Sequence, residues 1–165
     1  MSDGRRITLP PAFDENESDD EQNRVDTVLL GNAVPRKLIG TVDDTFYNHY
    51  SEIATIEANW NLHTLGRYDV GANVFRFVAE KTGDVTRKLK NLEQTFLNSS
   101  YPGVFNTGPK APLPIPNTSL VVNGRTVLKQ VKDIWGSPAL QKCTTYNGSL
   151  EIPSGANPPV LPPGC

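Results

Sequence analysis

The sequence predicts an α/β-type globular core that is rich in helices and is followed by a long, proline-rich irregular tail. Three observations lead to this prediction. Apolar residues recur at regular spacing through residues 25–98, as in the core of a folded domain. Residues 99–165 hold 11 of the 14 prolines and only short apolar runs. Residues 1–24 are polar and include the acidic run DENESDDE, which is typical of a solvated segment. Together the three segments have the length of one domain, about 100–200 residues.

The first predicted elements of the core are a strand and a helix. Residues 25–30, VDTVLL, have the composition of a buried strand, and Gly31 and Pro35 follow as breakers. A helix is predicted to begin at Asn48, because an asparagine side chain accepts a hydrogen bond from an amide in the first turn. At a 3.6-residue repeat one stripe of this helix holds four residues: His49, Ile53, Ile56 and Trp60.

Two further helices are predicted after the first. Asp69 caps the second, which ends at Gly83 in a left-handed turn. Its apolar face holds Val70, Val74, Phe77 and Val78. Asp84 is placed to cap the third, which has Val85, Leu89, Leu92 and Phe96 at helical spacing. In the tail, Asn123-Gly124 separates two apolar runs, and this pattern predicts a β-hairpin.

Composition argues against several classes of partner. The net charge is −2, so the sequence predicts no basic face and no nucleic-acid partner. The longest apolar runs are far shorter than the roughly 18 residues of a membrane helix. The first residues, MSDGRRITLPPAF, lack the apolar stretch of a secretory signal peptide.

Other features are typical of secreted proteins. Four N-glycosylation sequons begin at Asn16, Asn98, Asn117 and Asn147. Cys143 and Cys165 bracket the last Pro/Gly-rich arm. A disulfide between them would close a loop of about 20 residues and stabilise the fold by about 3 kcal/mol. Two unpaired thiols fit the sequence equally well.

Two places could carry chemistry. His49 lies in the first turn of its predicted helix, where the helix dipole favours a neutral ring that can bind a metal or approach a phosphate. A histidine that packs beside Ile53 fits the same spacing, and His63 has no obvious partner. Asp14 and Glu15 are adjacent carboxylates that can bind a divalent cation, although they also begin a charge run. The sequence has no GxSxG, HExxH, CxxC or P-loop motif.

Six stretches appear in the order and spacing of one family: FDEN, NRV, VLLGNAVP, YNHYSEIATIEANW, LGRYDVGANVF and FVAEKTGD. They resemble the C-terminal part of the fungal secreted acid phosphatases in the phosphoesterase family. That family also includes bacterial phospholipases C and belongs to the alkaline-phosphatase superfamily. The match covers residues 13–84 with specific motifs and continues through LNSSYPGVFN, PIPNTS and GRTVLKQV.

The resemblance implies the C-terminal portion of an alkaline-phosphatase-like α/β domain, with 25–98 as the phosphoesterase-family core. It implies that Asp14 and Glu15, the DE motif of the N-terminal segment, bind a divalent metal ion. It places His49 near the phosphate, as a ligand, a phosphate contact or an orienting residue. The implied substrate is a small phosphate monoester hydrolysed at acidic pH, and the implied location is secreted or cell wall. A glycan at Asn16 would obstruct the metal site, so the expected glycosylation sites are Asn98, Asn117 and Asn147.

The chain departs from the family pattern before the DE motif. The family's Ser or Thr nucleophile and an upstream Glu-Asn metal pair precede that motif, and here only a dozen residues do so. We therefore expect an inactive fragment with few strands and an incompletely covered apolar face on its helices. The alternatives are a non-catalytic secreted binding or structural protein that retains the helical half, and a phospholipase C-like diesterase fragment.

Overall fold

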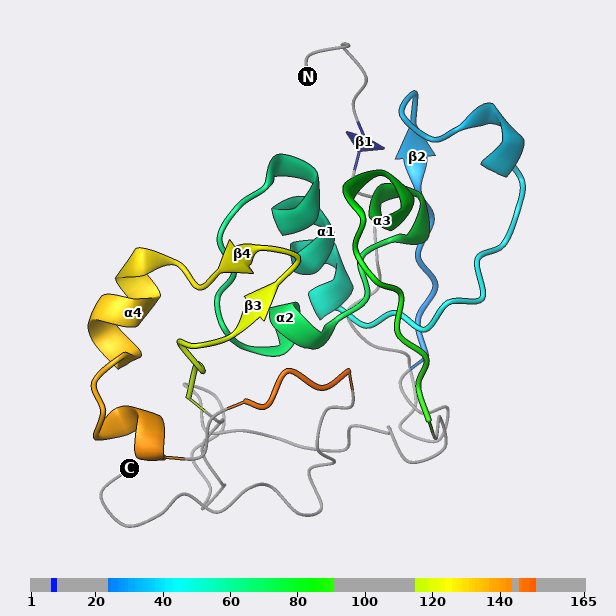
Figure 1. Cartoon of the computed structure of the whole chain (residues 1–165). Helices are drawn as coiled ribbons and strands as arrows, with labels where there is room; N and C mark the ends of the chain where they lie inside the picture. The colour runs from blue at the N-terminus through cyan, green and yellow to red at the C-terminus, as the bar shows by residue number, and fades with distance from the viewer. Residues whose placement is uncertain (1–6, 9–23, 91–114, 144–145, 151–165) are drawn as a thin grey trace, which may run out of the picture. The chain divides into compact units, whose positions relative to one another are not determined.

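The computed structural model describes residues 7–8, 24–90, 115–143 and 146–150 (Figure 1). The chain divides into two units, residues 1–45 and residues 46–165. Their boundary lies just before the segment that leads into the first α-helix.

The first unit contains one short pairing of strands. Strand β1 (Ile7–Thr8) pairs antiparallel with β2 (Leu30–Gly31), and a 3-10 helix, η2 (Arg36–Leu38), follows after Pro35. The predicted buried strand over residues 25–30 is wrong, because Leu30 alone enters the ladder and is 54% exposed. Val28 is 55% exposed. A pairing of two residues does not make a buried strand of the run.

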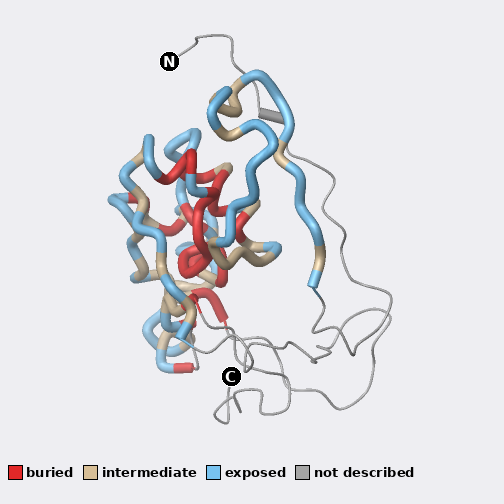
Figure 2. Tube along the Cα trace, turned by 90° about the vertical axis from the view of Figure 1, so that its right-hand side faces the viewer, coloured by how far each residue is buried: buried red, intermediate tan, exposed pale blue. Residues whose placement is uncertain are grey.

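The second unit is built around one central helix. Helix α1 (Tyr50–Trp60) contacts both α2 (Tyr68–Gly71) and α3 (Arg76–Thr82). A hairpin of β3 (Val121–Val122) and β4 (Arg125–Thr126) follows, and then α4 (Lys129–Trp135) and a 3-10 helix, η4 (Leu140–Lys142) (Figure 1). Figure 2 shows the buried residues concentrated in the helices and in the segments that join them.

Helix α1 packs through small side chains. Its buried residues are Ser51, Ala54, Thr55, Glu57 and Ala58, and small residues let neighbouring backbones approach closely. The predicted apolar stripe lies on another side: Ile53 is 38% exposed and Trp60 is 61% exposed. The incompletely covered apolar face that the sequence predicts is therefore present on α1.

The second predicted helix is two helices. The four residues of its apolar face are all buried, and Gly83 ends α3 at φ 78°, as predicted. However, the chain is not helical from Ala72 to Phe75, and α2 has one turn only. Interactions from outside the segment replace the helical ladder here: the Phe75 amide donates to Thr55 Oγ1 at 2.9 Å. The side chain of Asn73 bonds to backbone groups of distant residues.

The predicted third helix is wrong over its first turns. Residues 84–90 are not helical, and Val85 is 80% exposed. Asp84 does not act as a helix cap, because its carboxylate bonds to Arg125 of the hairpin. Leu92 and Phe96 lie outside the described residues.

The predicted hairpin is confirmed. Asn123 and Gly124 have φ values of 45° and 79°, the left-handed conformation that a two-residue type I′ turn requires. At the end of β4, the Thr64 amide donates to Thr126 O at 3.1 Å, and just after it the Leu128 amide donates to Thr64 O at 2.8 Å. These two bonds attach the hairpin to the loop that follows α1.

The described residues combine short helices with two two-stranded antiparallel sheets, which is compatible with a mixed α/β class. The alkaline-phosphatase-like architecture stays a prediction, as do the segment bounds at residues 24 and 98. Among the described helices, none has the length and apolar character needed to span a bilayer.

Candidate functional site

His49, the predicted site histidine, lies immediately before α1 and is exposed. A reciprocal pair of bonds holds the backbone around it. Asn48 Oδ1 accepts a hydrogen bond from the Tyr50 amide at 3.0 Å, and Ser51 Oγ accepts one from the Asn48 amide at 3.1 Å. Asn48 therefore caps the helix as the sequence predicts, and its neighbour His49 is held at the helix start.

The segment that leads into His49 is also anchored. Asn73, only 1% exposed, donates from Nδ2 to Phe46 O and to Arg87 O, both at 2.9 Å. Its Oδ1 accepts the Arg87 amide at 2.8 Å. The hydroxyl of Tyr47 accepts the Arg76 amide at 2.9 Å. The role of Asn73 was not predicted from the sequence, although an asparagine inside the apolar stretch GANVF was a signal that a buried amide has a structural partner.

The predicted metal ligands Asp14 and Glu15 lie outside the described residues. Within the residues that the structure describes, no group of three or more His, Cys, Asp or Glu side chains is arranged to hold a metal ion. The metal site therefore stays a prediction. Adjacent carboxylates are the hard oxygen ligands that divalent cations prefer, so the chemistry of this donor pair fits such an ion.

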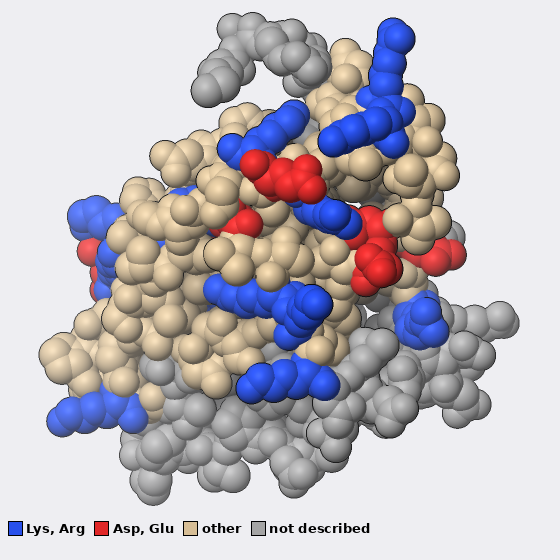
Figure 3. Space-filling model, turned by 45° about the vertical axis from the view of Figure 1, so that its right-hand side comes forward, with Lys and Arg blue, Asp and Glu red and all other residues tan. Residues whose placement is uncertain are grey.

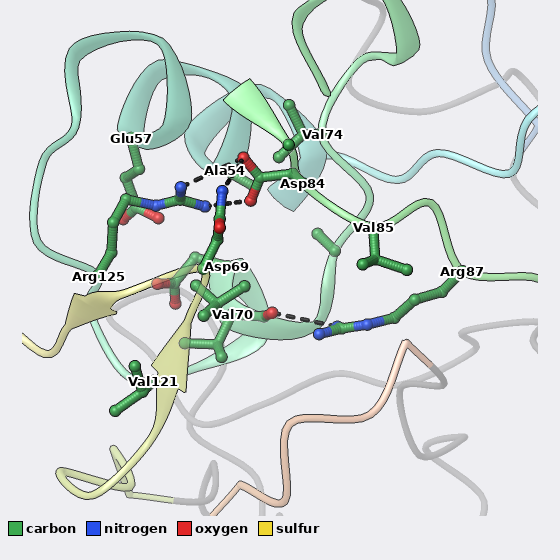
Figure 4. Close-up of a pocket in the computed structure, with 14 residues that line it drawn as sticks. Ala54, Glu57, Asp69, Val70, Val74, Asp84, Val85, Arg87, Val121 and Arg125 are labelled. Atoms are coloured by element: carbon green, nitrogen blue, oxygen red, sulfur yellow. Dashed lines mark hydrogen bonds and ion pairs between the residues drawn. The ribbon is translucent and has the colours of Figure 1, made fainter. Parts of the chain in front are cut away.

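A cavity of about 200 Å³ lies between α1, α2, the segment after α3 and the β3–β4 hairpin (Figure 4). Apolar side chains form part of its wall, including Val70 and Val121. Five charged side chains line the cavity: Glu57, Asp69, Asp84, Arg87 and Arg125. Of these, only Asp69 and Asp84 were singled out from the sequence, as expected helix caps. The cavity thus has both carboxylates and guanidinium groups on its wall.

An ion pair crosses this cavity from the hairpin to the segment after α3. Arg125 Nη2 lies 2.5 Å from Asp84 Oδ1, and Arg125 Nη1 lies 3.2 Å from Asp84 Oδ2. Asp84 also accepts hydrogen bonds from Thr82 Oγ1 and Asn123 Nδ2. Burial tends to raise the pKa of Asp84, but the hydrogen bonds from Arg125, Thr82 and Asn123 outweigh it and hold this pKa below its ordinary 3.8. Asp84 is therefore ionised at neutral pH.

A second pair of acidic side chains lies beside the first. Glu57 of α1 is 5% exposed and Asp69 of α2 is 3% exposed, and both line the cavity. Burial and the neighbouring charge of Asp69 raise the pKa of Glu57 to about 8, although the charge of Arg125 opposes the shift. Glu57 is thus mostly protonated at neutral pH. A perturbed carboxyl group in a cleft is a candidate for chemistry.

Arg87 completes the wall of the cavity. Its Nη1 donates to Val70 O at 3.1 Å and to Gly71 O at 2.7 Å, where α2 ends (Figure 4). A guanidinium at that position satisfies carbonyl groups that the short helix leaves free. The charged residues of the cavity therefore come from α1, α2, the segment after α3 and the hairpin, and His49 is not among the residues that line it.

The surface charge of the molecule is mixed. Among the described residues visible in Figure 3, basic side chains are separated by uncharged surface, and acidic side chains are interspersed with them. The absence of a nucleic-acid partner remains a prediction.

The predicted modification sites fall in different environments. Asn117 is half-buried, and its Nδ2 donates to Tyr146 O at 3.0 Å, whereas Asn147 is exposed. Cys143 is buried. Asn98 and Cys165 lie outside the described residues. Glycosylation and the Cys143–Cys165 disulfide therefore stay predictions.

Comparison with known proteins identifies the relatives of the chain. No protein-family model matches it, and no solved structure matches it significantly. The "Probable acid phosphatase" of Kluyveromyces lactis is 43% identical over 125 residues, which cover 74% of this chain and 29% of that protein. The "Phosphate-repressible acid phosphatase" of Penicillium chrysogenum is 47% identical over 95 residues, covering 58% and 23%. The "Acid phosphatase" of Aspergillus niger is 40% identical over 125 residues, covering 73% and 30%.

Identity of 40% or more over most of the chain shows that this protein descends from the same ancestor as a class of fungal hydrolases. The chain is homologous to a part of the fungal acid phosphatases, and the resemblance found in its motifs is confirmed. It spans less than a third of the length of these curated relatives.

Proposed function

We propose that this chain contributes to the hydrolysis of phosphate monoesters at acidic pH. The observation that carries this proposal is its identity of 40% or more with proteins named acid phosphatase. The substrate class is a small phosphate ester. The proposal includes secretion or attachment to the cell wall and glycosylation at exposed sequons.

In this proposal, Asp14 and Glu15 bind a divalent metal ion and His49 contacts the phosphate. A bound divalent ion would supply charge stabilisation for the phosphoryl oxygens. The geometry around His49 supports its part: Asn48 and Ser51 hold the backbone there, and the residue is exposed. A side chain on a fixed backbone can be aimed at a substrate without ordering a loop first.

Residues 1–165 tested alone are expected to show no turnover. By the resemblance, the nucleophile and the Glu-Asn metal pair belong to motifs that these residues do not contain. Two carboxylates by themselves are expected to hold a divalent ion only weakly. In a complete site, a hydroxyl nucleophile would attack phosphorus and form a covalent phosphoryl intermediate. This intermediate divides one difficult step into two easier ones.

A chimera tests the proposal. Residues 1–165 replace the homologous part of the Aspergillus niger relative, and the purified chimera is assayed with p-nitrophenyl phosphate and with phosphatidylcholine, with and without divalent metals. We expect hydrolysis of the monoester at acidic pH, and loss of that activity with Asp14→Ala or Glu15→Ala. The exposed Asp26→Ala is the matched control and should leave turnover unchanged.

Each other outcome identifies an alternative. Hydrolysis of the lipid alone would indicate a phospholipase C-like diesterase. A folded chimera that hydrolyses neither substrate would indicate a binding or structural protein. Turnover by residues 1–165 alone that Asp14→Ala abolishes would show that the expected incompleteness of the site is wrong.

A further inference from the structure

Asn73 lies where the chain leaves its helical path between α2 and α3, and it is 1% exposed. An asparagine side chain has one acceptor oxygen and one amide group that donates two hydrogens. Here the amide group donates to Phe46 O and to Arg87 O, both at 2.9 Å, and Oδ1 accepts the Arg87 amide at 2.8 Å. The donors and the acceptor of this buried side chain are therefore all used on backbone groups of other segments.

A second contact joins the same stretch of chain to the residues around Phe46. Tyr47 accepts the Arg76 amide through its hydroxyl at 2.9 Å. Its ring meets the ring of Phe75 edge to face, with the centroids 5.1 Å apart. The Phe75 amide in turn donates to Thr55 Oγ1 at 2.9 Å. The non-helical segment before α3 is therefore fixed both to α1 and to the chain that leads into α1.

The chain that leads into α1 depends on such contacts from outside. Residues 41–48 belong to no helix or strand, so the ladder of backbone bonds that fixes a regular element is not available to them. His49 follows them directly and is exposed. The path of the backbone up to His49 is thus set by side chains that reach it from other segments.

We propose that Asn73 is a positioning residue for His49. Its bond to Phe46 O fixes the chain three residues before the histidine and so sets the direction in which the chain enters α1. The inference rests on the proposed function, in which His49 contacts the phosphate, and Asn73 acts on the reaction only through His49. A displacement of about 1 Å in a group that contacts the substrate can cost about 100-fold in rate.

A purely structural role of Asn73 would have different consequences. A side chain that only stabilises the fold lowers the stability when it is removed, and it leaves the turnover of the folded molecules unchanged. A positioning residue lowers the turnover of the folded molecules, and it does so only while His49 is present. The two roles are therefore separated by measurements on the folded protein with and without His49.

Nitrogen-15 relaxation of the 165-residue chain tests the positioning without any enzyme activity. The order parameter of the His49 amide should be about 0.85 in the wild type, as in a rigid backbone, and should fall below about 0.6 in Asn73→Ala. The Ala58 amide, inside α1, should keep its value. Asn117→Ala is the matched control, because Asn117 also donates from a half-buried position to a backbone carbonyl, Tyr146 O, and it should leave the His49 amide rigid. An unchanged order parameter at His49 in folded Asn73→Ala would overturn the proposal.

Asn73→Asp covers the case in which the alanine variant does not fold. It keeps the shape of the side chain and an oxygen for the Arg87 amide. Burial beside two carbonyl groups favours a protonated carboxyl, which can donate to Phe46 O, whereas the ionised form cannot. Relative to the wild type at the same pH, the His49 amide should be rigid in acidic solution and lose order in alkaline solution. Equal rigidity in both solutions would count against the proposal.

A double-mutant cycle in the chimera with the Aspergillus niger relative measures the effect on turnover. Asn73→Ala should lower kcat for p-nitrophenyl phosphate about 100-fold at a temperature at which the variant is folded, and should have no further effect in a His49→Ala background. Equal losses in both backgrounds would show a structural role and overturn the proposal. If His49→Ala alone leaves turnover unchanged, the role of His49 in the proposed function is wrong, and the order parameters still decide whether Asn73 fixes this residue.

Discussion

Asp84 and Arg125 are 41 residues apart in the sequence, and their side chains form a two-point ion pair in which Arg125 is 5% and Asp84 is 3% exposed. The pair joins the end of α3 to the β3–β4 hairpin. Removal of one partner leaves the other charge buried without compensation, which costs more than the pair itself contributes.

Asp84→Ala and Arg125→Ala should therefore each lower the free energy of unfolding by about 3–5 kcal/mol. Urea denaturation followed by circular dichroism measures this change. The exposed pair of Lys129 and Asp133 within α4 is the matched control, because Asp133→Ala removes an ion pair in water and should cost at most about 1 kcal/mol. Equal losses in Asp84→Ala and Asp133→Ala would contradict the assignment of a buried pair.

Acid should weaken the same contact. The pKa of Asp84 is held below its ordinary 3.8 in the folded chain, so the stability it adds is present above 3.8 and is lost as the pH falls through the folded value. Glu57 acts in the opposite direction above 4.5. For these two groups together, the free energy of unfolding is greatest between pH 3.8 and 4.5.

Thermal unfolding at a series of acidic pH values measures this dependence. The midpoint of the wild type should fall on acidification below pH 3.8, and that of Asp84→Asn should fall less steeply. The two slopes would be the same if Asp84 were not protected by its hydrogen bonds.

Asn73→Ala should destabilise the chain through its lost hydrogen bonds. The substitution leaves three backbone groups of half-buried residues without their side-chain partner: Phe46 O, Arg87 O and the Arg87 amide. The cost is about 1–3 kcal/mol for each group that finds no other partner. Denaturant unfolding gives the loss. Asn59→Ala, at an exposed position of α1, should be neutral or slightly stabilising, since alanine favours a helix.

His49→Ala should lower turnover of the chimera by more than it lowers the thermal midpoint. In the proposed function this side chain contacts the phosphate, and positioning of the reacting group accounts for much of such a rate. Monoester kinetics and the thermal midpoint are measured on the same preparation. His63→Ala is the control, and a comparable fall in its turnover would count against a specific role for His49.

Asn147 rather than Asn117 should carry a glycan. Asn117 Nδ2 is engaged with Tyr146 O in a half-buried position, whereas Asn147 is exposed. Chains secreted from a fungal host should lose mass on deglycosylation in the wild type and in Asn117→Gln. Mapping of the glycan to Asn117 would show that its contact with Tyr146 does not form in the secreted protein.

The features that the sequence predicted correctly depend on nearby residues. Asn123-Gly124 forms its turn because both residues accept the left-handed conformation, and Gly83 ends α3 for the same reason. Val70, Val74, Phe77 and Val78 are buried as predicted, although the helix predicted to carry them is interrupted at residues 72–75. The kinship with fungal acid phosphatases was also contained in short contiguous motifs.

Three features could not be predicted in this way: the interruption of the helix at residues 72–75, the exposure of the strand-like run before Gly31, and the pairing of Asp84 with Arg125. The Phe75 amide bonds to Thr55 and the Asp84 carboxylate bonds to the hairpin, so both depend on groups far along the chain. The exposure of Val28 depends on which segments pack against it, and local sequence does not specify that. Local propensity ranks helix and cap positions by fractions of a kcal/mol to about 1 kcal/mol. A buried hydrogen bond or ion pair from a distant segment outweighs that preference, so the tertiary structure alone decided where these helices end and which carboxyl groups carry a charge.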